Sequence, residues 1–232
     1  MQIEVYVGEL PPIKRRKRMM NMIFDGKQLM KQPQGADLDY YGFIYEIDPE
    51  KEVKHARYKY LFVLQRIQEL FGADKDIRIM DVGCACGIFT NILADSKYDN
   101  VIGIDYSETA RIDYGRFTGK PVFEKLSEVN DAHYDLVVSI QTIEHMKDYM
   151  LFVKECWQKL KPGGAMILTT VKDGAIQDVH HHSIFRFYDI EALANALDNK
   201  SGFDIYAINR DTQTGPKLDC WGLIIKKEVH KK

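Results

Sequence analysis

The stretch Ile77-Arg-Ile-Met-Asp81-Val-Gly83-Cys-Ala-Cys-Gly87-Ile-Phe-Thr90 decides the fold of this chain. A short apolar run ends in an acidic residue, and two glycines that bracket small residues then lead into a segment with helical character. This order predicts a buried strand, a tight turn and the N-terminus of a helix. Glycine adopts backbone angles closed to other residues, and the free N–H groups of the helix start face whatever lies beyond the strand end.

The glycine spacing distinguishes this turn from two common phosphate-binding loops. Gly83 and Gly87 lack the first close pair of the dinucleotide motif G-x-G-x-x-G, and the lysine of a P-loop is absent. A second apolar run, from Val101 to Ile104, ends in Asp105. A carboxylate at the end of a neighbouring strand is placed to bind the two hydroxyls of a ribose. The pattern therefore predicts a ligand that carries a ribose but no pyrophosphate.

Four segments, in their order and spacing, resemble the class I S-adenosylmethionine-dependent methyltransferases. They are Asp81-Val-Gly-Cys-Ala-Cys-Gly87, Gly103-Ile-Asp-Tyr-Ser107, Tyr134-Asp-Leu-Val-Val-Ser-Ile-Gln-Thr-Ile-Glu-His145 and Leu160-Lys-Pro-Gly-Gly-Ala-Met-Ile-Leu168. The resemblance covers roughly residues 55 to 227 and departs from the family at Cys86, where a glycine is more frequent. It implies an enzyme with a doubly wound, mostly parallel seven-stranded α/β sheet that ends in a C-terminal antiparallel hairpin.

The same resemblance implies which residues bind S-adenosylmethionine. The methionine end is expected on the turn and the ribose on Asp105, with Asp81 helping to position the methionine end. Arg57 is the candidate for the cofactor's carboxylate, because the helix before the first strand often supplies such a residue; a surface arginine is the alternative. The complete expected set is Arg57, Asp81, Gly83, Cys84, Ala85, Gly87, Asp105, Tyr106, Ser139 and Gln141.

Methyl transfer from a sulfonium requires that the donor methyl group is aligned with the nucleophile and that water is excluded from the site. A general base is needed only if the acceptor binds in its protonated form. Histidine is the usual base near neutral pH. We expect this role for His145, which follows the fourth strand, and for His182 in the run His180-His181-His182. Local capping or packing is the alternative for His145, and a solvated loop is the alternative for the triple histidine.

Glu144 and His145 also raise the question of a metal ion. Some methyltransferases carry Glu-x-x-Glu-His after the fourth strand, but Gln141 replaces the first glutamate here, and losing that carboxylate weakens a magnesium site. We therefore expect no metal. The tetrapeptide typical of enzymes that methylate exocyclic base amines, Asn/Asp-Pro-Pro-aromatic, is replaced by Ser139-Ile-Gln-Thr, which counts against adenine N6 methylation.

The length of 232 residues suits one α/β domain with an extension. We expect the methyltransferase domain over residues 51–232 and an N-terminal extension or lid over residues 1–50, with a packed connector as the alternative for its Gly- and Pro-rich part. A helix is predicted over 52–71, and another that starts near His145 and runs to about residue 161. Strands are predicted over 77–81, 101–105, 121–124, 135–139, 165–170, 203–208 and 220–225.

Charge and cysteine content restrict the class of protein further. The formal net charge is −2, so no whole-chain field favours nucleic acid. The spacing of the four cysteines is typical neither of a disulfide framework nor of a zinc site. No segment is evident that is long and apolar enough to span a membrane or that has the pattern of a secretory signal. These observations predict a cytoplasmic protein. The basic run Lys14–Arg18 is expected to be a solvated helix face, with contact to RNA or an anionic substrate and a nuclear address as alternatives.

These observations lead us to expect methyl transfer to an oxygen or nitrogen of a small-molecule acceptor. One alternative is a methyltransferase acting on RNA or another macromolecule, held by Lys14–Arg18. The other is a module that binds S-adenosylmethionine without catalysis. Acceptor pockets in this fold come from loops without a readable motif, so the sequence leaves the acceptor and the oligomeric state open.

Overall fold

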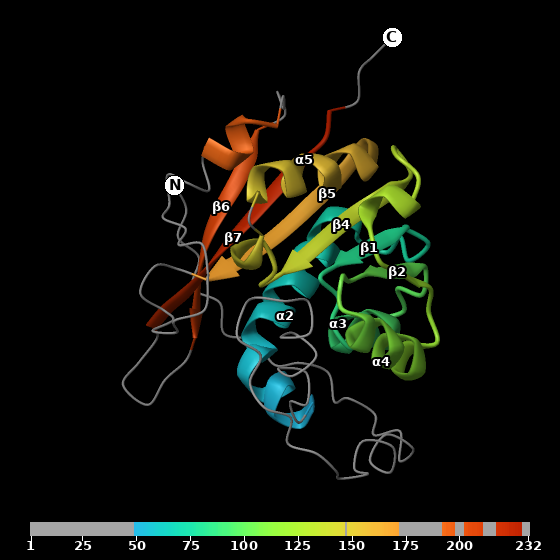
Figure 1. The fold of residues 1–232 in the computed structure, drawn as a ribbon. Helices are drawn as coiled ribbons and strands as arrows, with labels where there is room; N and C mark the ends of the chain where they lie inside the picture. Colours follow the sequence, from blue (N-terminus) through green and yellow to red (C-terminus); the bar gives the residue numbers. More distant parts are fainter. Residues whose placement is uncertain (1–48, 147, 172–191, 198–201, 211–216, 229–232) are drawn as a thin grey trace.

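The computed structural model describes residues 49–146, 148–171, 192–197, 202–210 and 217–228 (Figure 1). The described elements, in chain order, are α2 (Pro49–Phe71), β1 (Ile79–Val82), α3 (Ile88–Asp95), β2 (Val101–Ile104), α4 (Glu108–Thr118), β3 (Val122–Phe123), η1 (Leu126–Glu128), β4 (Tyr134–Ile140), η2 (Ile143–His145), α5 (Tyr149–Lys159), β5 (Leu160–Val171), β6 (Phe203–Arg210) and β7 (Lys217–Lys226). The alternation of strands and helices confirms the predicted α/β class.

The described strands form one seven-stranded sheet in the order β3-β2-β1-β4-β5-β7-β6. Strands β1 to β5 pair in parallel, whereas β7 runs antiparallel to both β5 and β6. This confirms the predicted sheet with its antiparallel C-terminal hairpin. The strand order reverses between β1 and β4, and in open α/β sheets ligands bind beyond the carboxyl ends of the strands at such a point.

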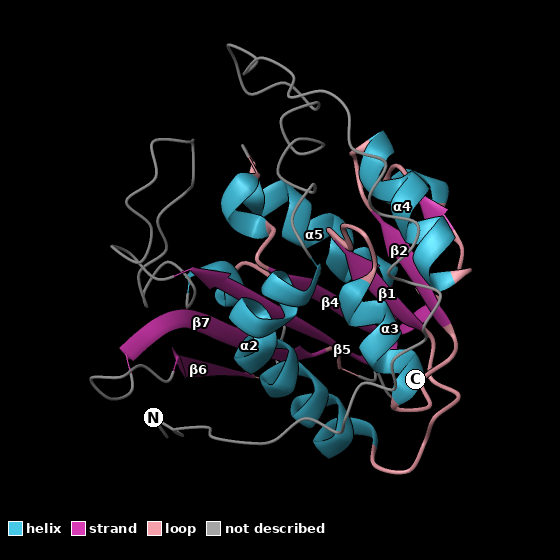
Figure 2. Cartoon of the chain, turned by 90° about the horizontal axis from the view of Figure 1, so that it is seen from below, coloured by secondary structure: helices cyan, strands magenta, loops and turns pink. Residues whose placement is uncertain are grey.

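Helices cover the sheet on both faces, and each face has its own apolar core (Figures 1 and 2). Strand β4 contributes to both cores: Leu136 and Val138 join one cluster and Val137 joins the other, as the period of two in a strand requires. The first cluster includes residues of α2 and α3, and the second includes residues of α5 and of residues 192–197. This explains why β4 is apolar almost throughout.

Two helix boundaries lie at residues that commonly end or begin helices. The N–H of Gly72 donates to the Gln68 carbonyl at 2.8 Å directly after α2, so the helix ends at a glycine. At the start of α4 the Ser107 hydroxyl oxygen accepts a hydrogen bond from the Ala110 N–H at 3.2 Å. These two contacts define the end of α2 and the start of α4.

The helix predicted to start near His145 and run to about residue 161 begins later in the structure. The chain first makes the short 3-10 turn η2, and α5 begins only at Tyr149. The reason is the Asp148 carboxylate, which accepts the Leu151 N–H at 2.9 Å and so caps a new helix. The consequence is that the residues directly after β4 lie in an irregular segment instead of a helix.

The strand predicted over 165–170 begins earlier in the structure. Pro162-Gly163-Gly164 belong to β5, which begins at Leu160 and pairs with β4 through a register shift near Tyr134. The Gly163 N–H donates to the Lys227 carbonyl and the Lys227 N–H donates to the Gly164 carbonyl. The end of β7 therefore supplies hydrogen bonds that keep this Pro-Gly-Gly segment in extended structure.

Several predictions fall on residues that the structure does not describe. Residues 1–48, including Lys14–Arg18, and the run His180–His182 are among them, so the extension or lid and its boundary near residue 50 stay predictions. In the described ranges, no helix combines the length and the apolar character needed to span a bilayer.

Candidate functional site

The turn between β1 and α3 contains two positions that only glycine fills without displacement. Gly83 has φ 74° and Gly87 has φ 86°. A Cβ on Gly83 would lie 2.1 Å from the Thr142 Oγ1, and one on Gly87 would lie 2.4 Å from the Thr118 Cγ2. The turn is thus packed against α4 on one side and against the segment after β4 on the other.

A third residue of the turn has the left-handed conformation without being glycine. Ala85 has φ 48°. Cys86, where the sequence departs from the family, does not have a positive φ. The left-handed conformation costs a non-glycine residue roughly 1–2 kcal/mol. The conformational demand of the turn therefore falls on Ala85 and not on Cys86.

The Asp105 carboxylate connects this turn to the end of β2. The Ala85 N–H donates to its Oδ2 and the Ser107 N–H donates to its Oδ1, each at 2.9 Å. Burial raises the pKa of this carboxyl, while these two backbone donors favour the ionised form. Since each carboxylate oxygen offers more than one acceptor site, Asp105 can still accept hydrogen bonds from a diol. The geometry thus fits a ribose held beside the glycine turn.

Asp81, at the end of β1, is only 2% exposed. The Thr90 hydroxyl from α3 donates to its Oδ2 at 3.0 Å. The pKa of Asp81 is raised to about 7, mainly by burial and to a smaller extent by the neighbouring Asp105 carboxylate. The hydrogen bond from Thr90 acts in the opposite direction. A carboxyl group in this state is stabilised in its charged form by a nearby cation, and the ammonium group of an amino-acid ligand is such a cation.

Three other residues of the expected cofactor set lie around the same strand ends. Cys84 is buried, and burial raises the pKa of its thiol well above the ordinary value, so the thiol stays neutral and packs in the turn. Tyr106 is 38% exposed beside Asp105. The Ser139 hydroxyl is buried and has no hydrogen-bond partner within the described part of the chain.

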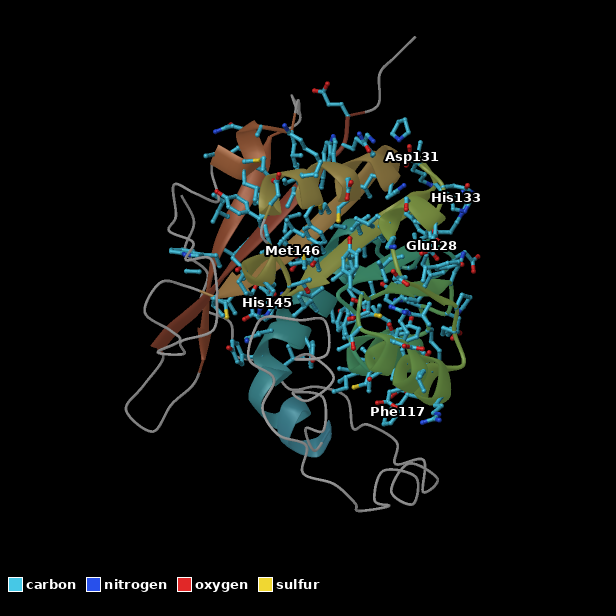
Figure 3. The ribbon with its side chains drawn as sticks, viewed as in Figure 1. Phe117, Glu128, Asp131, His133, His145 and Met146 are labelled. Carbon is cyan, nitrogen blue, oxygen red and sulfur yellow. The ribbon has the colours of Figure 1, made fainter. Side chains whose placement is uncertain are left out.

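The two predicted catalytic histidines remain untested. His145 ends η2, and its backbone N–H donates to the Thr142 carbonyl at 3.0 Å. In Figure 3 it lies where β4 and β5 end, close to α2 in this view, whereas Asp131 and His133 lie at the opposite end of β4. His182 lies outside the described residues, and the side chain of Arg57 on α2 is likewise not described.

A polar cluster that the sequence analysis did not predict occupies the carboxyl ends of β4 and β5. The Lys59 ammonium from α2 donates to the Gln141 Oε1 at 2.9 Å. The buried Glu144 carboxylate accepts the Thr170 hydroxyl at 3.0 Å. Gln141, which is in the expected cofactor set, donates its amide to the Thr169 Oγ1 at 3.4 Å. Lys59 lies two residues beyond Arg57, the residue of this helix that the sequence indicated.

A metal site is not formed by the described side chains. No group of three His, Cys, Asp or Glu residues in the described ranges is close enough to hold an ion. The donors that gather after β4 are instead an amide, a carboxylate, hydroxyls and the Lys59 ammonium. This donor set favours hydrogen bonding to an organic molecule.

Comparison with known proteins identifies a common family. The model of a methyltransferase domain family matches residues 53–208. The ubiquinone biosynthesis O-methyltransferase of Bordetella avium is 34% identical over 134 residues, which are 53% of this chain and 55% of that protein. The chain spans about half the length of the first curated relatives it matches.

Solved structures share the fold at low sequence identity. A SAM-dependent methyltransferase from Archaeoglobus fulgidus superposes with a TM-score of 0.60 at 16% identity, covering 81% of this chain and 100% of that one. Magnesium protoporphyrin IX methyltransferase from Synechocystis, with bound SAH, gives a TM-score of 0.60 at 14% identity, covering 82% and 94%. Both likenesses concern the fold.

Proposed function

Because the chain belongs to the class I S-adenosylmethionine-dependent methyltransferase family, we propose that it transfers the methyl group of this cofactor to an oxygen of a small-molecule acceptor. The choice of oxygen is supported by relatives such as the Bordetella avium protein, which is named as an O-methyltransferase. Nitrogen stays the alternative acceptor atom.

The observation that carries the proposal is the hydrogen bond from the Ala85 N–H to the Asp105 Oδ2 at 2.9 Å. It places the glycine turn, suited to an amino-acid tail, next to the carboxylate suited to a ribose. A ligand that carries both groups and no pyrophosphate matches this pairing. S-adenosylmethionine is such a ligand.

When bound, S-adenosylmethionine supplies an electrophilic methyl group on a sulfonium. Asp105 would accept hydrogen bonds from the ribose, and Asp81 would pair with the ammonium of the methionine end. The rigid turn fixes both carboxylates, because Gly83 and Gly87 are packed against side chains of neighbouring elements. The contribution of these residues is orientation of the donor methyl group toward the acceptor.

Calorimetric titration with S-adenosylmethionine and with S-adenosylhomocysteine tests the cofactor part of the proposal. Asp105→Ala should weaken binding about 10-fold or more through loss of charge-assisted hydrogen bonds. Asp113→Ala is the matched control, because the half-buried Asp113 side chain on α4 pairs with the exposed Arg116 of the same helix and is not in the expected cofactor set. If neither ligand binds the folded protein, or if Asp105→Ala leaves the dissociation constant unchanged, the assignment is wrong.

A second measurement separates small-molecule from RNA acceptors. The basic run Lys14–Arg18 would hold RNA through its phosphates, so binding would fall steeply with salt concentration. Neutralising the run should leave turnover of a small hydroxylated acceptor unchanged if the proposal holds. Salt-sensitive RNA binding that disappears in the neutralised variant would favour a macromolecular acceptor instead.

A further inference from the structure

We propose that Lys59 and Glu144 form the acceptor end of the site, with Lys59 binding the reacting oxygen of the acceptor and Glu144 taking its proton. This inference rests on the proposed methyl transfer to oxygen and adds the residues that prepare the nucleophile. It also defines the acceptor as one with an ionisable hydroxyl. The histidines expected from the sequence are not required for this step.

Lys59 reaches the carboxyl end of β4 from a different element. It lies on α2, and its Nζ donates to the Gln141 Oε1 at 2.9 Å while the ammonium sits 5.6 Å from the centre of the Tyr58 ring. Lys59 is half-buried, and its hydrogen bond to Gln141 is only partly shielded from solvent. An ammonium has three donor hydrogens, and the bond to Gln141 occupies one of them.

Gln141 holds this ammonium in place at a conformational cost. Its φ is 55°, a left-handed angle that is uncommon for residues other than glycine. The backbone N–H of Gln141 donates to the Thr169 carbonyl at 3.0 Å, and its side-chain amide meets the Thr169 hydroxyl at 3.4 Å. Strained residues held by several contacts cluster at functional sites. Gln141 is thus a positioning residue for Lys59.

Glu144 lies in η2, three residues beyond Gln141, and its Oε2 accepts the Thr170 hydroxyl at 3.0 Å, directly after the Thr169 that Gln141 contacts. It is 2% exposed, and burial raises its pKa to about 7, while the Thr170 hydroxyl and the Lys59 ammonium act in the opposite direction. The other titratable groups of the cluster are the Cys220 thiol on β7 and the Tyr58 hydroxyl on α2, and His145 is the next residue in the chain. A general base is most effective when its pKa is near the working pH.

The proposed step balances in atoms and charge. The hydroxyl O–H bond of the acceptor breaks, and the proton passes to the Glu144 carboxylate. The resulting oxyanion, paired with the Lys59 ammonium, forms a bond to the donor methyl group. The bond between that methyl group and sulfur breaks, and its electron pair stays on sulfur as a neutral thioether. Glu144 then releases the proton to water.

The test uses 4-nitrophenol as a probe, because its neutral and ionised forms absorb at different wavelengths. The full chain is saturated with S-adenosylhomocysteine, so that no turnover occurs, and the absorbance of the bound probe is recorded against pH. We expect the probe to ionise at lower pH when bound than when free. Lys59→Met should abolish this shift, whereas Lys154→Met, at an exposed position on α5, should retain it.

Proton release on probe binding tests Glu144 separately, by calorimetry in buffers with different ionisation enthalpies. When the probe binds as the anion to the wild type, Glu144 keeps the proton and little reaches the buffer. In Glu144→Gln about one proton per bound anion should be released instead, by conservation of protons. Glu69→Gln, an exposed position on α2, should behave like the wild type. Equal proton release in the wild type and in Glu144→Gln would overturn the role of Glu144.

An infrared difference spectrum of wild-type protein labelled in its glutamate carboxyl carbons gives a third measurement that needs no variant. Probe binding should produce the band of a protonated carboxyl group, and its absence would contradict the proposal. If S-adenosylhomocysteine binds but the probe stays neutral or does not bind, the Lys59–Glu144 assignment is wrong and the proposed function stands. If S-adenosylhomocysteine itself does not bind, the proposed function fails.

Discussion

Cofactor binding should release a proton, because Asp81 is buried and its pKa is raised to about 7. The ammonium of S-adenosylmethionine favours the ionised carboxylate, so below this pH the protein must lose the proton before it binds tightly. At pH 7 about half of the Asp81 side chains are ionised, and at pH 6 roughly one in ten. The dissociation constant should therefore rise about 5-fold from pH 7 to pH 6 and roughly 10-fold more at pH 5.

Isothermal titration calorimetry in buffers of different ionisation enthalpy measures this directly. Near pH 6 close to one proton should leave the complex, and the count should fall toward zero at about pH 8. Asp105 has a raised pKa as well, and the Cys84 thiol and Tyr114 hydroxyl stay neutral throughout, so a variant is needed to identify the group.

Asp81→Asn keeps the shape of the side chain and removes the titration. Its affinity at pH 8 should be lower than that of the wild type, and its proton release should be close to zero. If the wild type shows the same affinity at pH 6 and pH 8, Asp81 does not pair with the ammonium. If Asp81→Asn retains the full pH dependence, Asp105 or another group is responsible.

Three further predictions concern stability. Ala85→Gly should stabilise the protein by roughly 1 kcal/mol in urea denaturation, because Ala85 has φ 48°; a loss of stability would show that the turn gains from the methyl group. Gly87→Ala should destabilise it by more than about 2 kcal/mol, since the added Cβ would meet the Thr118 methyl group at 2.4 Å with φ at 86°; an unchanged urea midpoint would mean that the turn relaxes freely. The raised pKa of Asp81 contributes stability that is complete below its unfolded-state value near 3.8 and is lost by about pH 7, up to about 4 kcal/mol. The melting temperature of the free protein should therefore fall over this range. Asp81→Asn should make this fall smaller without removing it, because the pKa values of Glu144 and Asp105 are raised as well.

The proximity of the glycine turn to Asp105 could be predicted because its signals are local. Asp81, the glycine turn and Asp105 each sit at the end of an apolar run, and parallel strands bring such ends to one edge of the sheet. The Ala85–Asp105 hydrogen bond joins residues only 20 positions apart. The mostly parallel seven-stranded sheet and its closing antiparallel hairpin, which the family resemblance implied, were confirmed.

The acceptor side could not be predicted because its contacts are distant and its backbone is unusual. Lys59 and Gln141 are 82 positions apart, and no periodic pattern links them. Nothing in the residue type of Gln141 indicates a left-handed conformation, because glycine and asparagine are the usual signals. Asp148 was read as part of a continuous helix, although its carboxylate caps a new one and leaves Glu144 in the preceding 3-10 turn.

Strand β7 enters the sheet between β5 and β6 although it follows both in the chain. Gly222 on β7 lies under the ring of Phe62 on α2, where a Cβ would be 2.7 Å from the ring, and the Cys220 thiol lies 3.8 Å from the Gln141 Oε1. The helix that carries Lys59 therefore rests on a strand that the ribosome makes much later. During synthesis, the residues that make the Ala85–Asp105 hydrogen bond are therefore all present before the strand that contacts Phe62 and Gln141 exists.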